Sequence, residues 1–174
     1  KEAICAKFMR DNGLSFSTEQ INVSPGGKAV LWNALAVTAG PGDEVIIPTP
    51  CWVSYPDMVK LTGATPVLLP GEADFKIRAE TLRAAITPKT RWLMLNSPSN
   101  PTGAVYSADE LRDLAEVLRD HPQIMVLTDD IYEALVYGDA KFATMASVAP
   151  DLIDRTLTMN GVSKAYAMTG FRIG

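Results

Sequence analysis

The chain has 174 residues, with 16 Lys and Arg against 20 Asp and Glu, which gives a formal net charge of −4. Its 47% hydrophobic and 21% charged residues are typical of one globular domain and argue against a disordered or collagen-like chain. The acidic balance gives no support for a protein that binds nucleic acid. No apolar run has the roughly 18 residues of a membrane span and no signal peptide opens the chain, so we expect a cytoplasmic protein with no membrane partner.

The scarcity of histidine and cysteine limits the chemistry that the chain can perform. His121 is its one histidine, and Cys5 and Cys51 lie far apart in the sequence. Zinc sites, Ser-His-Asp triads and disulfide frameworks are therefore poorly supplied. We expect no metal, and we expect catalysis to depend on Lys, Asp, Tyr, Arg or a cofactor.

Apolar spacing and turn residues divide the chain into alternating helices and strands. An opening helix ends near Gly13, and a short extended piece over residues 20–23 follows. This alternation predicts an α/β domain with a mostly parallel sheet and helices on both faces. In chain order, we expect a helix over 28–39, a strand over 44–48, a helix over 52–61, a strand over 65–69, a helix over 79–86, a strand over 91–96, a helix over 107–120, a strand over 124–127, a helix over 131–136 and a strand over 156–159.

The unusual side chains of this sequence follow the predicted strands. In parallel α/β sheets, ligands gather where the carboxyl ends of the strands meet their loops. Trp52, Asn100, Asp129 and Lys164 each follow a different predicted strand. We therefore expect them to meet at one site, and this convergence is the main functional signal.

A glycine pair, Gly26-Gly27, followed by Lys28, opens the first helix after the extended piece. The backbone N–H groups and the dipole at a helix N-terminus favour a phosphate, and glycine lets the phosphate approach closely. An ordinary turn before a helix is the alternative. The pattern matches neither a Walker loop nor a complete G-x-G-x-x-G, so it does not imply a nucleotide.

Residues 96–103, with the sequence NSPSNPTG, contain two X-Pro bonds at the end of a strand. They predict a stiff bend that fixes the Asn100 amide, which can then donate to an oxygen atom of a ligand. A rigid turn with a purely structural role is the alternative.

Asp129 and Tyr132 follow the strand predicted over 124–127. A carboxylate has little reason to be buried without a cationic partner. Asp129 can face a protonated ring nitrogen, and Tyr132 can hydrogen-bond a phenolate nearby. The alternative is that Asp129 caps a helix, which is a common use of aspartate.

Ser163-Lys164 follows the last predicted strand, and Arg172 lies eight residues after the lysine. A lysine at the end of a strand can form a Schiff base with a carbonyl group. An arginine can bind a phosphate with two parallel hydrogen bonds. Taken alone, a solvated surface lysine is the commoner interpretation.

One cofactor uses all of these groups. Pyridoxal phosphate (PLP) needs an amine for its aldehyde, an acid for its pyridine nitrogen, a donor for its phenolate, a flat surface for its ring and an anion cradle for its phosphate. We therefore predict a PLP site. The sequence offers, in the same order, Lys164, Asp129, Tyr132, Trp52, and Gly26-Gly27 with Arg172.

The longer motifs resemble those of the class I and II aminotransferases of PLP fold type I. The matching segments are SPGGKA (24–29), PCWVSYP (50–56), NSPSNPTG (96–103), DDIYE (129–133) and SKAYAMTGFRIG (163–174). They follow the order and spacing of the family over essentially the whole chain. The closest likeness is to the bacterial aspartate/prephenate aminotransferases.

The resemblance implies a role for each residue around the cofactor ring. Lys164 is the lysine that binds the cofactor covalently and moves the proton during the reaction. Asp129 pairs with the pyridine nitrogen. Tyr132 and Asn100 hold the phenolate oxygen, and Trp52 stacks on the ring.

The resemblance also implies which residues bind the substrate and the phosphate. Asn100 reaches the α-carboxylate of the substrate beside Trp52, and Lys28 meets a distal carboxylate, which favours acidic substrates. The peptide bonds Thr49-Pro50 and Asn100-Pro101 are expected to be cis. The residues expected around the phosphate are Gly26, Gly27, Lys28, Ser163 and Arg172.

By the same resemblance, residues 1–174 form the large, PLP-binding domain of a homodimer. The chain starts inside a predicted helix and stops in the middle of an element, so we expect a fragment without its N-terminal segment and small domain. The full enzyme would move an amino group between an amino acid, such as aspartate, and a 2-oxo acid. The isolated fragment would be inactive.

Other functions fit the same motifs. A PLP-dependent lyase or an enzyme like aminocyclopropane-carboxylate synthase is the alternative within enzymes. A PLP-sensing domain of a transcription regulator, or a structural domain without activity, is the alternative outside them.

Overall fold

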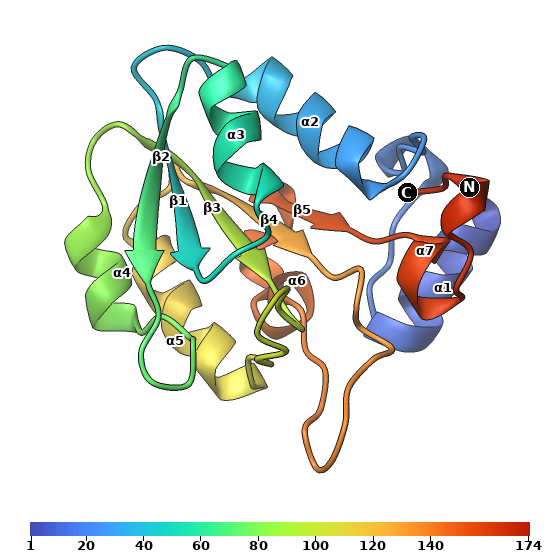
Figure 1. The fold of residues 1–174 in the computed structure, drawn as a ribbon. Coiled ribbons are helices and arrows are strands. Elements are labelled where there is room, and N and C mark those ends of the chain that lie inside the picture. Colours follow the sequence, from blue (N-terminus) through green and yellow to red (C-terminus); the bar gives the residue numbers. More distant parts are fainter.

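A computed structural model describes all 174 residues, and helices alternate with strands along the chain (Figure 1). The helices are α1 (Glu2–Asn12), α2 (Gly27–Thr38), α3 (Ser54–Leu61), α4 (Ala79–Ala85), α5 (Ala108–Arg119), α6 (Met145–Val148) and α7 (Val162–Ala165). The strands are β1 (Glu44–Thr49), β2 (Thr65–Pro70), β3 (Thr90–Asn96), β4 (Met125–Asp129) and β5 (Thr156–Met159), and three short 3₁₀ helices cover Thr18–Gln20, Pro150–Arg155 and Thr169–Phe171.

The five strands form one parallel sheet in the order β2-β1-β3-β4-β5, with helices on both faces (Figure 1). This confirms the α/β fold class predicted from the sequence. Successive side chains of a strand point to opposite faces, and β1 follows this rule. Val45 and Ile47 pack with α2 and α3, whereas Ile46 packs with α4 and α5. Each face therefore has its own apolar core.

The register of the sheet brings the polar strand ends to one edge. Asn96 at the end of β3 lies beside Asp129 at the end of β4, and Asp129 lies beside Met159 at the end of β5. The carboxyl ends of these parallel strands therefore lie at the same level, where ligands of such sheets gather. The loops that follow these strands start side by side.

The helix expected over residues 131–136 was a wrong prediction. The carboxylate of Asp129 accepts a hydrogen bond from the Ile131 backbone N–H at 3.3 Å, and the chain then forms a tight turn in which the Glu133 N–H donates to the Asp130 carbonyl. Aspartate side chains that bond to nearby N–H groups offer the backbone an alternative to a helix. The segment continues as an irregular loop.

Smaller differences concern element ends. The helix expected from residue 52 begins at Ser54, and the extended piece expected over 20–23 follows the 3₁₀ helix Thr18–Gln20 without forming a strand. A capping box starts α5, because Ser107 accepts from the Glu110 N–H and Glu110 accepts from the Ser107 N–H. None of the helices combines the length and the apolar character that a bilayer crossing requires.

Candidate functional site

A cavity of about 200 Å³ lies at the carboxyl ends of β3, β4 and β5, next to the first turn of α2. Side chains from segments far apart in the sequence meet there, as the strand-end pattern predicts. Gly26, which precedes Gly27 in the chain, is not part of the lining. The lining includes the predicted residues Gly27, Lys28, Trp52, Asn100, Asp129, Tyr132, Ser163, Lys164 and Arg172.

Asp129 forms the buried end of the cavity and is only 4% exposed. The Tyr55 hydroxyl donates to its carboxylate at 2.6 Å, and the Ile131 N–H donates at 3.3 Å. Burial raises the pKa of Asp129 to about 6, and the hydrogen bonds from Tyr55 and Ile131 oppose this rise. No cationic side chain of the chain forms an ion pair with it, so its negative charge lacks a partner in a buried place.

Tyr55 on α3 is a site residue that the sequence pattern does not reveal. It lies under the cavity and is buried, and burial together with the adjacent Asp129 raises the pKa of its hydroxyl. It therefore stays protonated and acts as a hydrogen-bond donor to the carboxylate. Tyr55 falls on the buried face of α3 beside Met58 and Val59, so its place in the sequence is typical of a core residue.

Asn96 fixes the bend that carries Asn100. Its amide nitrogen donates to the Asp129 backbone carbonyl at 2.7 Å, and its amide oxygen accepts from the Asn100 backbone N–H at 2.7 Å. Asn96 thus joins the loop after β3 to the end of β4. The peptide bonds at Thr49-Pro50 and Asn100-Pro101 are cis, as predicted, and the bond at Ser97-Pro98 is also cis.

Asn100 and Tyr132 come together across the cavity. The Asn100 amide nitrogen lies 3.4 Å from the Tyr132 hydroxyl, in hydrogen-bonding geometry. Lys164 on α7 lies on the open side, with its Nζ atom 5.8 Å from the centre of the Tyr132 ring. An amide, a phenol and a primary amine therefore face the same space.

Trp52, which lies just before α3, lines the cavity. Its ring meets the Tyr55 ring edge to face, with centroids 5.4 Å apart. The Lys28 Nζ atom lies 4.8 Å from the centre of the indole ring, which is a cation–π contact. Trp52 therefore lines the cavity with the Lys28 ammonium beside its ring.

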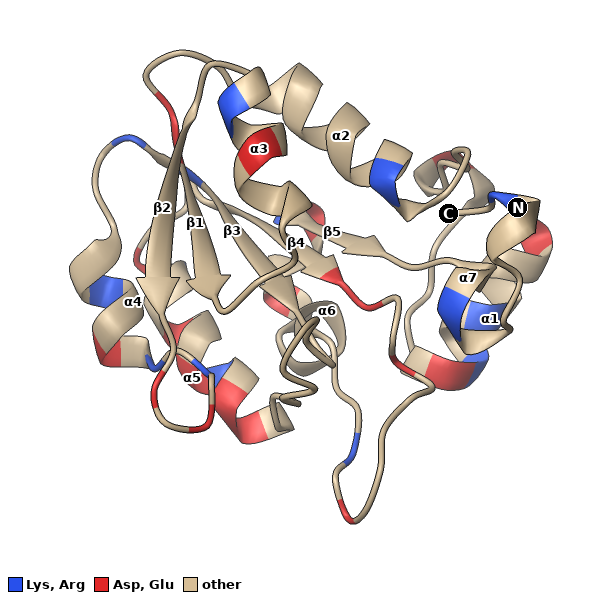
Figure 2. Ribbon diagram, in the orientation of Figure 1, with Lys and Arg blue, Asp and Glu red and all other residues tan.

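The last residues of the chain pack on the glycine turn that starts α2. Ser24 and Gly174 exchange two backbone hydrogen bonds, and Pro25 pairs with Ile173. Gly26 has a φ of +91°, and a Cβ atom there would collide with Nη2 of Arg172. The Arg172 guanidinium therefore occupies space that only glycine leaves open. This places the Arg172 guanidinium beside the N-terminus of α2. Figure 2 shows that α2 itself carries a basic segment and no acidic one.

Comparison with known proteins gives a consistent family. The model of the aminotransferase class I and II family matches residues 1–174. The chain is 58% identical to the aspartate/prephenate aminotransferase of Cereibacter sphaeroides and 60% identical to the probable aspartate/prephenate aminotransferase of Rhizobium leguminosarum bv. phaseoli. Each match covers 100% of this chain and 44% of the relative, so the chain spans less than half the length of these relatives.

Solved structures share the fold. The crystal structure of the aspartate aminotransferase from Rhizobium meliloti superposes with a TM-score of 0.97 at 54% identity, covering 99% of this chain and 44% of that one. The aspartate aminotransferase from Thermus thermophilus with maleate gives a TM-score of 0.93 at 45% identity, with the same coverage. These matches confirm the resemblance drawn from the sequence motifs.

Proposed function

The chain belongs to the class I and II aminotransferase family, and from this membership we propose that the protein containing it is a PLP-dependent aminotransferase. It would move an amino group between an amino acid and a 2-oxo acid. The activity, the substrates and a homodimeric state are proposed for the whole protein. Strongly exposed apolar side chains, Val37, Val53 and Phe171 among them, leave surface for further domains or a second subunit to cover.

The unpaired carboxylate of Asp129 is the observation that carries this proposal. A buried anion is costly unless a cation or several hydrogen bonds compensate it. Asp129 has two donors, Tyr55 and the Ile131 N–H, and no cation. A protonated pyridine nitrogen entering the cavity would supply the missing positive charge, and Asp129 would in turn keep that nitrogen protonated.

The opposite end of the cavity fits a phosphate group. Arg172 lies against Gly26, where a Cβ atom would collide with its guanidinium, and α2 begins at the adjacent Gly27. A guanidinium and a helix N-terminus both favour a phosphate dianion. The buried acid and the basic phosphate cradle therefore fit the two ends of PLP.

Lys164 is the one residue of the set that would bond to the cofactor. Its primary amine lies on the open side of the cavity, beside Tyr132. When bound, PLP supplies an electron sink that stabilises negative charge at the substrate Cα. The Lys164 Nζ atom would accept the proton from the substrate Cα and would then donate it to the cofactor. Its position supports this role, because the amine faces the cavity next to Tyr132 and forms no ion pair with an acid.

The remaining side chains would orient the ring. Tyr132 and Asn100, already 3.4 Å apart, would donate to the phenolate oxygen, and Trp52 would form the wall on one face of the ring. Asn96 would keep Asn100 in place through its 2.7 Å hydrogen bond. Such fixed donors need no rearrangement when charge develops during the reaction.

An acidic substrate is favoured by the charges at the open side. Lys28 lies at the rim beside Trp52, held by a cation–π contact and by no carboxylate. A dicarboxylate with its second acid near Lys28 would gain an ion pair. The names of the relatives, aspartate/prephenate aminotransferase, and the Thermus thermophilus structure with maleate support this choice.

The test uses the full-length protein purified with PLP. Borohydride reduction and peptide mapping should place the cofactor on Lys164, and L-aspartate should discharge the visible absorbance band with release of oxaloacetate. Lys164→Ala should lose both results, whereas Lys60→Ala, at an exposed site on α3, should keep them. Release of ammonia and a 2-oxo acid from one substrate would indicate a lyase instead, and binding without turnover would indicate a sensor domain.

A further inference from the structure

Glu133, the residue after Tyr132, is held on both of its carboxylate oxygens by α1. Lys7 forms an ion pair with one oxygen, and the Asn12 amide nitrogen donates to the other at 3.0 Å. The Lys7 ammonium also donates to the Asn12 amide oxygen at 2.8 Å. These three side chains, called here the Glu133 clamp, join α1 to the turn after β4, and Asp11 lies 4.0 Å from the Lys7 ammonium as a second, more distant acid.

The clamp is shielded from solvent. The side chains of Lys7 and Glu133 are 17% and 10% exposed, whereas Arg10 and Asp11 on the same helix form an ion pair that is 65% and 35% exposed. Removing one partner of a shielded pair leaves the other charge uncompensated and costs far more than breaking a surface pair. The clamp therefore constrains the position of α1 relative to Glu133.

Helix α1 has little else to fix it to the site. Its apolar side packs on a small core of Phe8, Leu14, Ile21 and Ala146, which is separate from the two cores that flank the sheet. Because this core is small, the apolar burial that holds α1 is smaller than the burial in either of the two cores that flank the sheet. The polar clamp is the direct link between α1 and the segment that carries Tyr132.

The turn that ends at Glu133 is tight, so a displacement of the carboxylate reaches Tyr132. The Glu133 N–H donates to the Asp130 carbonyl at 2.9 Å, and the Leu135 N–H donates to the Tyr132 carbonyl at 2.8 Å. Asp130 is itself anchored by its N–H on the Met159 carbonyl at 2.9 Å. Tyr132 is thus held between a fixed strand end and the clamp.

We propose that Glu133 is a positioning residue that couples the docking of α1 to the binding of PLP at Tyr132. The inference rests on the proposed function. Coupling between two parts of a protein is reciprocal. Weakening the clamp should therefore weaken PLP binding, and PLP binding should protect α1 from opening.

The experiment measures PLP dissociation from the full-length protein by the change in cofactor absorbance. Lys7→Met keeps the apolar stem of the lysine, and Glu133→Gln keeps the shape of the carboxylate. Each should raise the PLP dissociation constant by about 5- to 10-fold, the lower part of the usual range for coupled sites. Arg10→Met, which removes an exposed ion pair from the same helix, should leave it unchanged.

Two further measurements separate positioning from general destabilisation. In a Tyr132→Phe background, Glu133→Gln should lose most of its effect on PLP affinity, because the hydroxyl through which it acts is gone. Hydrogen exchange of the α1 amides should slow when PLP binds to the wild type but not when it binds to Lys7→Met. If either variant fails to fold, Asn12→Ala, which removes one hydrogen bond, takes its place.

The outcomes distinguish this inference from the proposed function. If the wild type binds PLP and the clamp variants bind it as tightly as Arg10→Met does, the coupling is wrong and the proposed function stands. An effect of Glu133→Gln that persists undiminished with Phe at position 132 also overturns the coupling. If the wild type binds no PLP, the proposed function fails, and the inference fails with it.

Discussion

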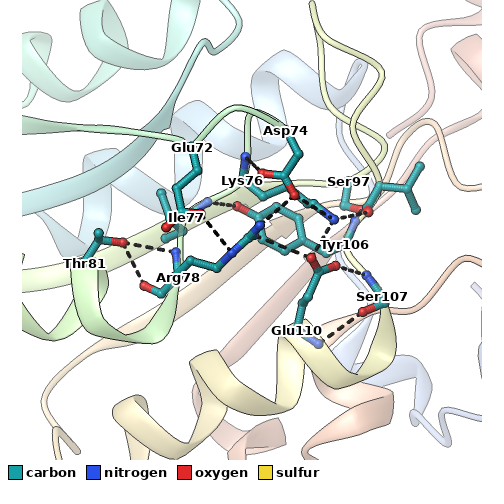
Figure 3. A network of polar contacts seen from close by, with 11 residues as sticks. Glu72, Asp74, Lys76, Ile77, Arg78, Thr81, Ser97, Tyr106, Ser107 and Glu110 are labelled. Atoms are coloured by element: carbon teal, nitrogen blue, oxygen red, sulfur yellow. Dashed lines mark hydrogen bonds and ion pairs between the residues drawn. The ribbon is translucent and has the colours of Figure 1, made fainter.

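Two charged regions of the molecule differ in how their charges are balanced. Around Arg78, the loop before α4 and the start of α5 bring together Glu72, Asp74, Lys76, Arg78 and Glu110 (Figure 3). Lys76 lies 2.6 Å from Glu110 and 3.3 Å from Asp74, while Arg78 lies 2.7 Å from Asp74. In this Arg78 network each charge has at least one opposite neighbour.

The cavity has the opposite arrangement. Asp129, Lys28, Lys164 and Arg172 line one space, yet none of them forms an ion pair with another side chain. The charges of the Arg78 network already have opposite partners, so they attract a charged ligand only weakly. The unpaired charges of the cavity can instead bind a ligand that carries the opposite charges. Unmatched charges that share one cavity, rather than the number of charges, therefore distinguish this region from the Arg78 network.

The largest expected effect comes from removing the unpaired anion. Asp129→Asn in the PLP-loaded, full-length protein should lower kcat/KM with aspartate by about 10³-fold, within the range for a group that controls protonation in a reaction. A neutral amide cannot stabilise a protonated ring nitrogen. Steady-state kinetics would measure this, with Asp57→Asn on the surface of α3 as the control. Equal activity of the two variants would remove Asp129 from the mechanism.

The same substitution should stabilise the protein when PLP is removed. Burial raises the pKa of Asp129 from 3.8 to about 6, so the ionised form is disfavoured in the folded state. The penalty on the stability of the folded state is absent below pH 3.8. It grows as the pH rises from 3.8 to about 6, and it is complete above pH 6. It amounts to about 3 kcal/mol.

We therefore expect apo Asp129→Asn to exceed the apo wild type in free energy of unfolding by up to about 3 kcal/mol at pH 8, with the difference vanishing near pH 4. Urea unfolding at a series of pH values would measure it. A variant that is less stable at pH 8 would show that the hydrogen bonds from Tyr55 and Ile131 already compensate the carboxylate, and the contrast with the Arg78 network would be wrong.

The end of the cavity that we propose for the phosphate can be tested by substituting Gly26. In Gly26→Ala the new Cβ atom would collide with the Arg172 guanidinium, on a backbone with a φ of +91°. We expect PLP binding to weaken by about 10- to 100-fold because the guanidinium must move away, equivalent to about 1–3 kcal/mol. Equilibrium dialysis would measure the affinity.

Gly42 provides a matched control for that substitution. Its φ is +97°, and nothing lies within 4 Å of its Cβ position. Gly42→Ala should therefore carry the backbone strain without the collision, and it should lower stability without changing PLP affinity. If Gly26→Ala and Gly42→Ala bind PLP equally well, the close contact between Gly26 and Arg172 does not contribute to PLP binding.

The smallest effect is expected in the Arg78 network. Arg78→Met should lower the free energy of unfolding by less than about 1 kcal/mol, because the network is partly exposed and two of its acids, Asp74 and Glu110, keep Lys76 as a partner. The kcat with aspartate should not change. A large loss of activity would mean that the balanced network also serves the site.

Much of the site could be predicted because its residues are local to strand ends. Asp129 and Asn100 follow their strands directly, and the parallel topology then brings them to one edge. The roles of Tyr55 and Asn96 were not predicted, because both residues bond to Asp129, which is distant in sequence. It lies 74 residues from Tyr55 and 33 residues from Asn96. Only the packing of α3 beneath the sheet edge makes Tyr55 a donor to Asp129.

The helix wrongly expected over 131–136 has the same kind of origin. Its apolar spacing is helical, but the Asp129 carboxylate takes the Ile131 N–H and the Glu133 clamp holds the turn from α1. A local pattern cannot contain a contact with a partner 121 residues away. Element types over the rest of the sheet depend on local pattern and were predicted correctly.

The pairing of Ser24 and Pro25 with Ile173 and Gly174 has a consequence for biosynthesis. The anion cradle is closed by the two backbone hydrogen bonds between Ser24 and Gly174. A ribosome must therefore deliver the segment through Gly174 before the turn at Gly26 meets its arginine. The five strands and both cores can assemble earlier, because their residues precede this segment. The turn at Gly26 is thus completed after the segments that form the sheet have been synthesised.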